Sequence, residues 1–171
     1  MPLICSIIPM RRTRLPDIYL LLINRYLLRK IDLVRLKGEI AVKIVLMADN
    51  SKNELLVNFC IAYRPLLSKH QLISVYNTGK LLKSAVDIEV SGLSVDYESG
   101  FEQLASRAEY NEIDCVIYLR DGRNNPMNSS IELLKVCDLN NIPYATNIAT
   151  AETLILAIDR GDLDWREWIK N

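Results

Sequence analysis

The chain has 171 residues, half of them hydrophobic, and its 21 lysine and arginine residues are balanced by 21 aspartate and glutamate residues. This length fits one domain with a sizeable core and is too short for two ordinary ones. A neutral balance provides no long-range field for nucleic acid or for an acidic partner, so we expect a protein that binds no nucleic acid.

The chain contains four cysteines without CxxC spacing and a single histidine, His70. This set does not supply the ligands of a zinc site, and free cysteine commonly behaves as a small hydrophobic residue. We therefore expect reduced thiols in a cytoplasmic protein, with no metal and no cofactor.

Residues 1–41 differ in charge from the rest: they hold eight lysine or arginine residues against three acids, whereas residues 42–171 hold thirteen against eighteen. The basic cluster at 11–14 follows the first apolar run instead of preceding it, which argues against a secretory signal. The apolar run 18–23 is well short of the ~20 residues that span a bilayer, so we expect no membrane span. A membrane-surface helix over 15–36, basic on one side, is the alternative interpretation.

The junction between these two parts suggests a further hypothesis. Lys37-Gly38-Glu39 is readily encoded by a purine-rich ribosome-binding sequence, and Val42 could be encoded by a GTG start codon. On this hypothesis residues 1–41 are an extension outside the fold, and the domain covers residues 42–171. The intact mass of the protein from its native host tests it, because a mass that includes residues 1–41 contradicts it.

From residue 43 onward, short apolar runs alternate with segments of helical periodicity. A buried strand is predicted over 43–47, and the helix after it should end near Arg64 because Pro65 follows. Further strands are predicted at 72–76, 93–97, 115–119 and from Pro143, and further helices at 80–86, 101–110, 131–139, 151–158 and 159–170.

This alternation predicts an α/β protein, a three-layer open parallel sheet with helices on both faces. Ligands of such sheets bind at the carboxyl ends of the strands, where the connecting loops gather. Here those loops are 48–53, 77–80, 98–100, 121–130 and 146–150, all rich in small and polar residues. We expect any ligand site at this edge of the sheet.

The most informative segment is 141–152, which has the pattern of a strand that enters a polar turn and starts a helix. Its small and hydroxyl residues let backbone or ligand approach closely, and Asn147 or Thr150 is expected to cap the helix. Such a turn suits an anionic ligand.

The same segment closely resembles the carboxyl-terminal signature of the methylglyoxal synthase family. The similarity covers nearly all of residues 43–171 and is also strong at 43–48, at Ile61-Ala62-Tyr63 and at 113–121. It implies a methylglyoxal synthase-like fold with flavodoxin-like winding, assembly into homo-oligomers and, in active members, conversion of dihydroxyacetone phosphate to methylglyoxal and phosphate. A similar domain is the regulatory module of carbamoyl phosphate synthetase.

The resemblance also implies where catalytic groups should lie, and this sequence departs from the family there. Active members place a His-Asp pair and then a lysine after the first strand, whereas this chain has Asp49-Asn50 and Asn53. The family's general-base aspartate is replaced by Phe101, and its histidine-containing loop after Asp121 has no counterpart in residues 124–130. His70 is expected in a solvated turn at the opposite edge of the sheet.

Part of the family's phosphate cradle is retained as Asn77, Thr78 and Gly79, although Tyr76 stands where the family has a glycine. These residues could donate hydrogen bonds to an anion, and the alternative is an ordinary helix cap and turn. Glu102 could replace the missing base if the helix start shifts by one residue. The alternative is a glutamate that complements the helix dipole.

The sequence is compatible with three functions. We favour a non-catalytic or repurposed domain that binds a small anion, such as a phosphate ester or nucleotide, and works as a homo-oligomer. The second is a divergent methylglyoxal synthase, a carbon-oxygen lyase acting on phosphates, with proton transfer by Asp49, Asp121 or Glu102. The third is a partner module that uses Trp165 and Trp168 as its contact face. The predicted ligand-binding residues are Asn53, Asn77, Thr78, Gly79, Ser99, Gly100, Thr146, Asn147 and Thr150.

Overall fold

The structure is a computed structural model, and it describes residues 41–93, 96–124 and 127–169, with no account of the side chains of 168 and 169. All of these residues belong to one compact unit, Glu39–Asn171. The expectations for residues 1–40 and for the Trp168 side chain lie outside the described residues, so the proposed domain boundary stays a prediction. Within the described ranges, no helix is both long enough and apolar enough to span a membrane.

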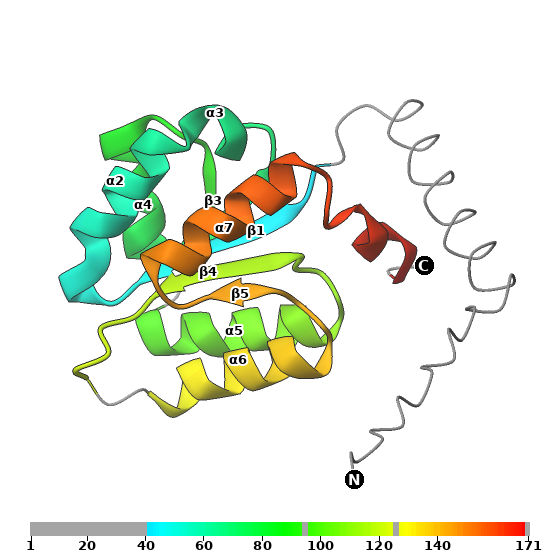
Figure 1. Cartoon of the computed structure of the whole chain (residues 1–171). Coiled ribbons are helices and arrows are strands. Elements are labelled where there is room, and N and C mark those ends of the chain that lie inside the picture. The colour runs from blue at the N-terminus through cyan, green and yellow to red at the C-terminus, as the bar shows by residue number, and fades with distance from the viewer. Residues whose placement is uncertain (1–40, 94–95, 125–126, 170–171) are drawn as a thin grey trace, which may run out of the picture. The chain divides into compact units, whose positions relative to one another are not determined.

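The strands form one parallel sheet, as predicted (Figure 1). They are β1 (Lys43–Ala48), β2 (Gln71–Val75), β3 (Val90–Leu93), β4 (Cys115–Leu119) and β5 (Tyr144–Ala145). Their spatial order is β3-β2-β1-β4-β5. The expected flavodoxin-like winding is wrong in this detail, because that winding has the order 2-1-3-4-5. Here the chain adds β2 and β3 on one side of β1 before β4 is added on the other.

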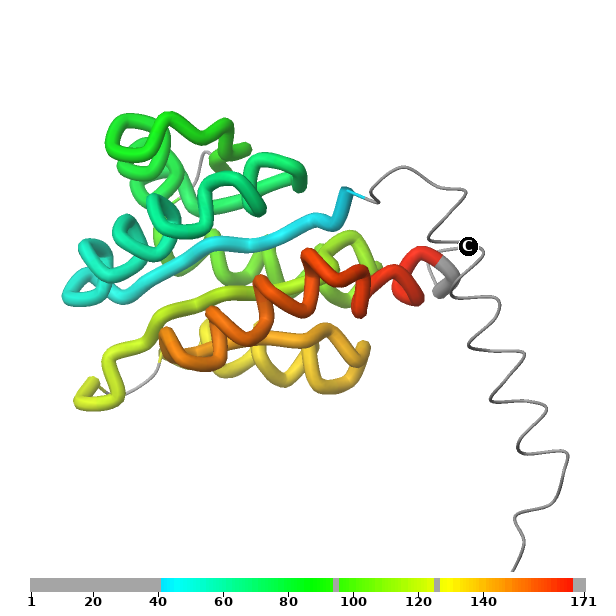
Figure 2. The backbone as a smooth tube through the Cα atoms, turned by 45° about the horizontal axis from the view of Figure 1, so that its top comes forward, coloured from blue at the N-terminus to red at the C-terminus, as the bar shows by residue number. Residues whose placement is uncertain are grey.

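Helices cover both faces of the sheet, which confirms the three-layer class (Figures 1 and 2). One face carries α2 (Asn53–Ala62), α4 (Tyr76–Val86) and α7 (Ile148–Asp159). The other carries α5 (Tyr97–Glu109) and α6 (Asn128–Leu139). Parallel sheets need cover on both faces because their strands are apolar on both sides.

The residues of β1 show how the core divides. Ile44 and Leu46 pack with the helices of the first face, and Val45 and Met47 pack with those of the second. All four side chains are fully buried. The alternation follows the period of two residues in a strand, so a continuous apolar run fills both layers of the core.

Two predicted boundaries near the third strand are wrong. β3 pairs with β2 from Leu72↔Val90 to Val75↔Leu93, so the strand ends where it was predicted to begin. Helix α5 then starts at Tyr97, because the Asp96 carboxylate accepts a hydrogen bond from the Ser99 amide and caps the helix.

Several helix ends also differ from the expectation. A short 3₁₀ turn, η1 (Asn50–Lys52), precedes α2, and α2 ends at Ala62. The chain then makes a separate helix, α3 (Arg64–Leu67), because Pro65 is tolerated in a first turn. The final segment is a 3₁₀ helix, η2 (Asp164–Ile169).

Arg166 of η2 is fully buried at the amino-terminal edge of the sheet. Its Nε lies 3.5 Å from Oδ1 of Asp114, which is also fully buried. Its other nitrogens donate to the carbonyl oxygens of Asn141 (2.7 Å) and Ile113 (3.2 Å) and to the side chain of Asn111 (3.3 Å). Asn111 and Asn141 both have left-handed backbone conformations, which asparagine tolerates, and these conformations form the turns that Arg166 joins.

Candidate functional site

The candidate site lies where β1 and β4 end side by side. The chain winds in opposite directions from these two strands, and a parallel sheet opens a ligand crevice at such a switch point. Asp49 follows β1 directly, and Asp121 comes two residues after β4. The topology therefore brings together two of the predicted catalytic residues.

The Asp49 carboxylate is held by two protein donors. The Tyr118 hydroxyl donates to Oδ1 at 2.6 Å, and the Asp121 backbone amide donates to Oδ2 at 2.7 Å. The Asp49 amide itself donates to the Leu119 carbonyl at 3.0 Å. Asp49 thus ties the end of β1 to β4 and to the loop that follows it.

Asp121 is the centre of a second set of contacts, although only 6% of its side chain is exposed. Ser51 donates to Oδ2 at 2.8 Å, and the Arg123 guanidinium donates to both oxygens at 2.9 and 3.0 Å. These donors hold the pKa of Asp121 well below its usual range, with the Arg123 hydrogen bond as the largest cause and Ser51 next. A carboxylate held in this way is a weak base.

Three aromatic rings pack beside Asp49. Phe101 is fully buried, and its ring centroid lies 5.1 Å from that of Tyr97 and 5.0 Å from that of Tyr118, both in edge-to-face arrangements. The Tyr97 hydroxyl donates to the Ala48 carbonyl at 2.9 Å. The residue that replaces the family's general base therefore belongs to a packed aromatic cluster, Tyr97–Phe101–Tyr118.

Burial also changes the acidity of the two tyrosines. It is the largest cause of the raised pKa of Tyr118, about 12, and the hydrogen bond to Asp49 adds to it. Burial raises the pKa of Tyr97 still further, helped by the nearby Tyr118. Both hydroxyls are neutral hydrogen-bond donors at physiological pH.

The predicted phosphate cradle lies in the first turn of α4, not in a loop before it. Val75 precedes the helix and offers no side-chain cap, so the amides of the first turn have no capping side chain. Thr78 and Gly79 are buried, whereas Asn77 and Tyr76 are exposed. A Cβ at Gly79 would meet Gly92 Cα at 3.6 Å, so the helix passes close to β3 there.

The other predicted residues occupy different places at the same edge. Asn53 starts α2, and its side-chain oxygen is buried without a hydrogen-bond partner among the described residues. Ser99 donates to the Asp96 cap at 2.7 Å, and Gly100 is buried in the same first turn of α5. Glu102 is exposed, whereas the neighbouring Phe101 faces the core.

The polar turn before α7 forms as predicted. The Asn147 side chain caps the helix by accepting from the Thr150 amide at 3.0 Å and from the Thr150 hydroxyl at 3.2 Å. The Thr146 carbonyl accepts from the Arg120 amide at 3.0 Å, which joins this turn to the end of β4. The cap uses polar groups of Asn147 and Thr150 that were predicted to bind a ligand.

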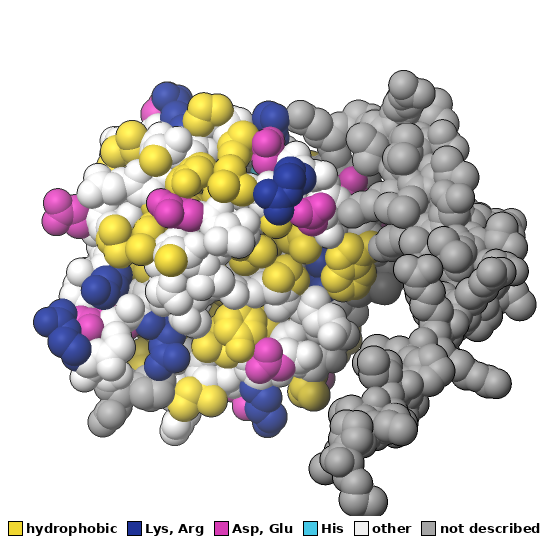
Figure 3. Space-filling model, in the orientation of Figure 1, with side chains coloured by type: hydrophobic (Ala, Val, Ile, Leu, Met, Phe, Trp, Pro, Cys, Tyr) yellow, Lys and Arg dark blue, Asp and Glu magenta, His cyan; other side chains and the backbone are white. Residues whose placement is uncertain are grey.

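The rim of the site has charged side chains. Figure 3 shows lysine and arginine side chains, with acidic ones among them, at the left edge of the molecule, where β1 and β4 end in Figure 1. Lys52, Arg120 and Arg123 belong to the loops after these strands. Among the residues that the structure describes, no group of three histidine, cysteine or acidic side chains is arranged to hold a metal ion.

Sequence reasoning missed Ser51, Tyr97, Tyr118 and Arg123, which make most of the contacts around the two aspartates. A signal was present for Tyr118, because its hydroxyl interrupts an otherwise apolar strand next to a polar loop. No comparable signal marks Ser51 or Arg123, since short polar residues and arginine are common in loops.

His70 lies in the turn before β2, at the opposite edge of the sheet from Asp49, as expected. Its backbone amide donates to the Leu67 carbonyl at 3.1 Å. The expectation of a solvated ring is wrong, because both ring nitrogens are buried.

Fold and site together define an α/β protein with polar residues gathered at the switch point of a parallel sheet. No family model matches the chain. It is 48% identical over 128 residues to methylglyoxal synthase of Caldicellulosiruptor saccharolyticus, covering 74% of this chain and 91% of that protein. It is 40% identical over 131 residues to methylglyoxal synthase of Alkaliphilus metalliredigens, covering 75% of this chain and 98% of that protein.

A solved structure agrees with these relatives. The crystal structure of methylglyoxal synthase from Elizabethkingia anophelis superposes with a TM-score of 0.61 at 28% identity, covering 67% of this chain and 77% of that one. The chain belongs to the methylglyoxal synthase family, as the sequence resemblance predicted.

Proposed function

We propose that this protein is a family member whose crevice binds a small anion, such as a phosphate ester, without carrying out the lyase reaction. One observation supports the loss of catalysis above all others. Phe101, at the position that the resemblance assigns to the general base, is fully buried between Tyr97 and Tyr118. A phenyl ring has no group that can accept the substrate proton.

The remaining carboxylates are poor replacements. Asp121 has a lowered pKa and accepts from Ser51 and Arg123, and Asp49 accepts from Tyr118 and the Asp121 amide. Glu102 points away from the core. Loss of one acid-base group typically lowers a rate by about 100- to 10,000-fold, and the histidine, the lysine and the base are all replaced here.

Several features support binding of an anion at this edge. The first turn of α4 has no capping side chain, so its amides are available to phosphate oxygens. Lys52 and Arg120 add positive charge in the nearby loops, whereas the charge of Arg123 is balanced by Asp121. Asn77, Thr78 and Gly79 are the residues that we assign to the anion, with Asn53 beside them at the start of α2. The homo-oligomeric state that the family resemblance implies, and the cytoplasmic location expected from the free cysteines, are part of the same proposal.

The competing function is a divergent methylglyoxal synthase, and the 48% identity to a protein of that name favours it. The two functions are separated by incubating the full chain with dihydroxyacetone phosphate and following methylglyoxal and phosphate release. We expect no turnover above the uncatalysed rate. Turnover that is abolished by Asp49→Ala or Glu102→Ala would establish the lyase instead.

Binding is tested separately by thermal unfolding with inorganic phosphate, triose phosphates and nucleotides. A ligand that binds only the folded state raises the unfolding temperature, and the rise increases with the logarithm of its concentration relative to its dissociation constant. We expect at least one of these anions to raise it. If none does, anion binding is contradicted.

A further inference from the structure

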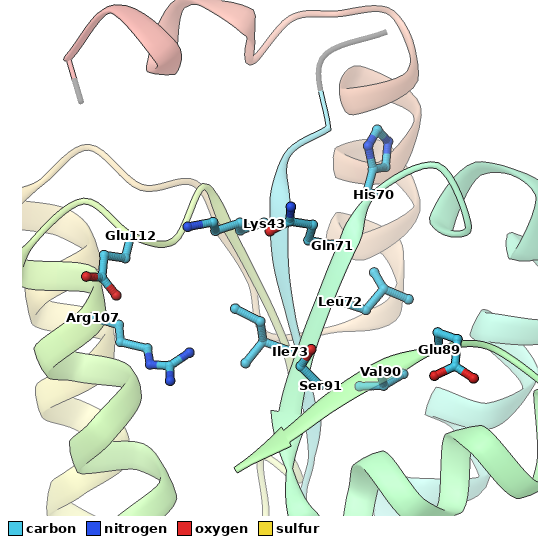
Figure 4. Close-up of a pocket in the computed structure, with 10 residues that line it drawn as sticks. All are labelled: Lys43, His70, Gln71, Leu72, Ile73, Glu89, Val90, Ser91, Arg107 and Glu112. Carbon is cyan, nitrogen blue, oxygen red and sulfur yellow. The ribbon is translucent and has the colours of Figure 1, made fainter. Parts of the chain in front are cut away.

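A polar cleft lies at the amino-terminal edge of the sheet, opposite the Asp49 site. It has a volume of about 450 Å³. On the α5 side it is lined by Lys43, Gln71, Ser91, Arg107 and Glu112 (Figure 4). These side chains come from three strands and from the end of α5, with Ile73 as an apolar floor.

The two cations of this cleft point into it from opposite walls. In Figure 4 the Lys43 side chain extends from β1 toward α5, and the Arg107 side chain extends from α5 toward β2. Within the described ranges, neither side chain forms an ion pair, whereas the nearby Glu89 is paired with Lys83 at 3.0 Å. The described lining also has two carboxylates, Glu112 and Glu89. Because Glu89 is paired with Lys83, the part of the lining around Lys43 and Arg107 has a net positive charge.

Backbone hydrogen bonds hold the chain in place at both cations. The Lys43 amide donates to the buried Asp114 carboxylate at 2.8 Å, and the Lys43 carbonyl accepts from the Asp114 amide at 3.0 Å. The Arg107 carbonyl accepts from the Glu112 amide at 2.9 Å, which closes the end of α5. Because the Arg107 carbonyl already accepts this hydrogen bond, its partial negative charge repels a nearby anion less strongly.

We propose that this cleft binds a small oxyanion, a carboxylate or phosphate group, between Lys43 and Arg107. Arginine can hold two oxygens of such a group in a fork, and lysine adds a point charge. The Gln71 amide and the Ser91 hydroxyl can complete the set of donors. The site is distinct from the crevice of the proposed function, so either can fail without the other.

The test is a titration of the ¹⁵N-labelled full chain, in one series with inorganic phosphate and in another with acetate, followed by amide chemical shifts. Saturable shifts are expected at Lys43, Ser91 and Glu112, and the tighter of the two probes identifies the anion class. Lys43→Gln and Arg107→Gln should each weaken binding about tenfold, since each removes a charge-assisted contact. Lys135→Gln, an equal charge loss on exposed α6, should leave it within twofold.

Glu112→Gln provides a second variant with little risk to folding, because Glu112 is exposed. It removes the carboxylate that lies on the same side of the cleft as Arg107 and should tighten phosphate binding. The proposal is overturned if these amides do not shift, or if their shifts persist in the Lys43→Gln/Arg107→Gln double variant. Shifts confined to Asn77, Thr78 and Gly79 would leave the crevice proposal standing and reject this one.

Discussion

The Tyr118 hydroxyl donates a hydrogen bond to Oδ1 of Asp49 at 2.6 Å, so a tyrosine of β4 holds the carboxylate that follows β1. This hydrogen bond holds the Asp49 side chain against the end of β4. A carboxylate acting as a base needs an oxygen that can turn toward substrate, and here one oxygen faces Tyr118 and the other the Asp121 amide.

Tyr118→Phe is the direct test of that contact. It removes one donor from a partly buried carboxylate, and we expect the free energy of unfolding to fall by about 1 to 2 kcal/mol. Denaturant unfolding measures it. Tyr110→Phe is the matched control, because Tyr110 is 75% exposed and loss of its hydroxyl should change stability by less than about 0.5 kcal/mol. Equal effects of the two changes would contradict the structural role of Tyr118.

The buried pair of Arg166 and Asp114 leads to a larger expected effect. Arg166→Met leaves the Asp114 carboxylate buried without its cation, which should cost about 3 to 5 kcal/mol of stability. Thermal or denaturant unfolding measures the loss. Arg160→Met removes an exposed partner of Asp162 and should cost less than about 1 kcal/mol. Equal stability of the two variants would contradict the burial of Arg166 beside Asp114.

Gly79→Ala tests how α4 passes β3. The new methyl group would meet its nearest atoms at 3.6 to 3.8 Å, which is ordinary van der Waals contact. Alanine in place of glycine within a helix then stabilises by roughly 0.5 to 1 kcal/mol. An upward shift of the denaturation midpoint is expected. A loss of more than about 1 kcal/mol would show that the helix lies closer to the strand.

The pH dependence of stability should reveal Asp121. Its folded pKa is depressed, so its contribution is present above the pKa of the unfolded chain and is lost as the pH falls toward the folded value. With an unfolded aspartate pKa of about 3.9, the loss begins near that pH. The difference in unfolding free energy between the natural chain and Asp121→Asn should therefore shrink below about pH 4. A difference that stays constant from pH 6 to pH 3 would contradict the contact with Arg123.

The layers of the fold were predictable because the physical signals are local. The apolar run at 43–48 and the alternating helices require a parallel sheet that is covered on both faces. The start of α5 was missed because a single capping residue, Asp96, overrides the weak strand pattern at 93–97. The strand order was missed because periodicity does not show on which side of β1 each new strand is added.

The site was predictable only in part, for a related reason. Asp49 and Asp121 follow strands that are recognisable from the sequence, so their meeting at one edge could be expected. Their partners could not, because Tyr118 reaches Asp49 across 69 positions and Ser51 reaches Asp121 across 70. Such contacts depend on the strand register, which a sequence pattern does not specify.

Arg166 links parts of the chain that are far apart in sequence. Its side chain contacts Asp114, and the other oxygen of that carboxylate accepts from the amide of Lys43, the first residue of β1. Detachment of η2 would remove the cation that balances this carboxylate. Helix η2 and the first residues of β1 should therefore open as one cooperative unit, with similar protection of their amides against hydrogen exchange.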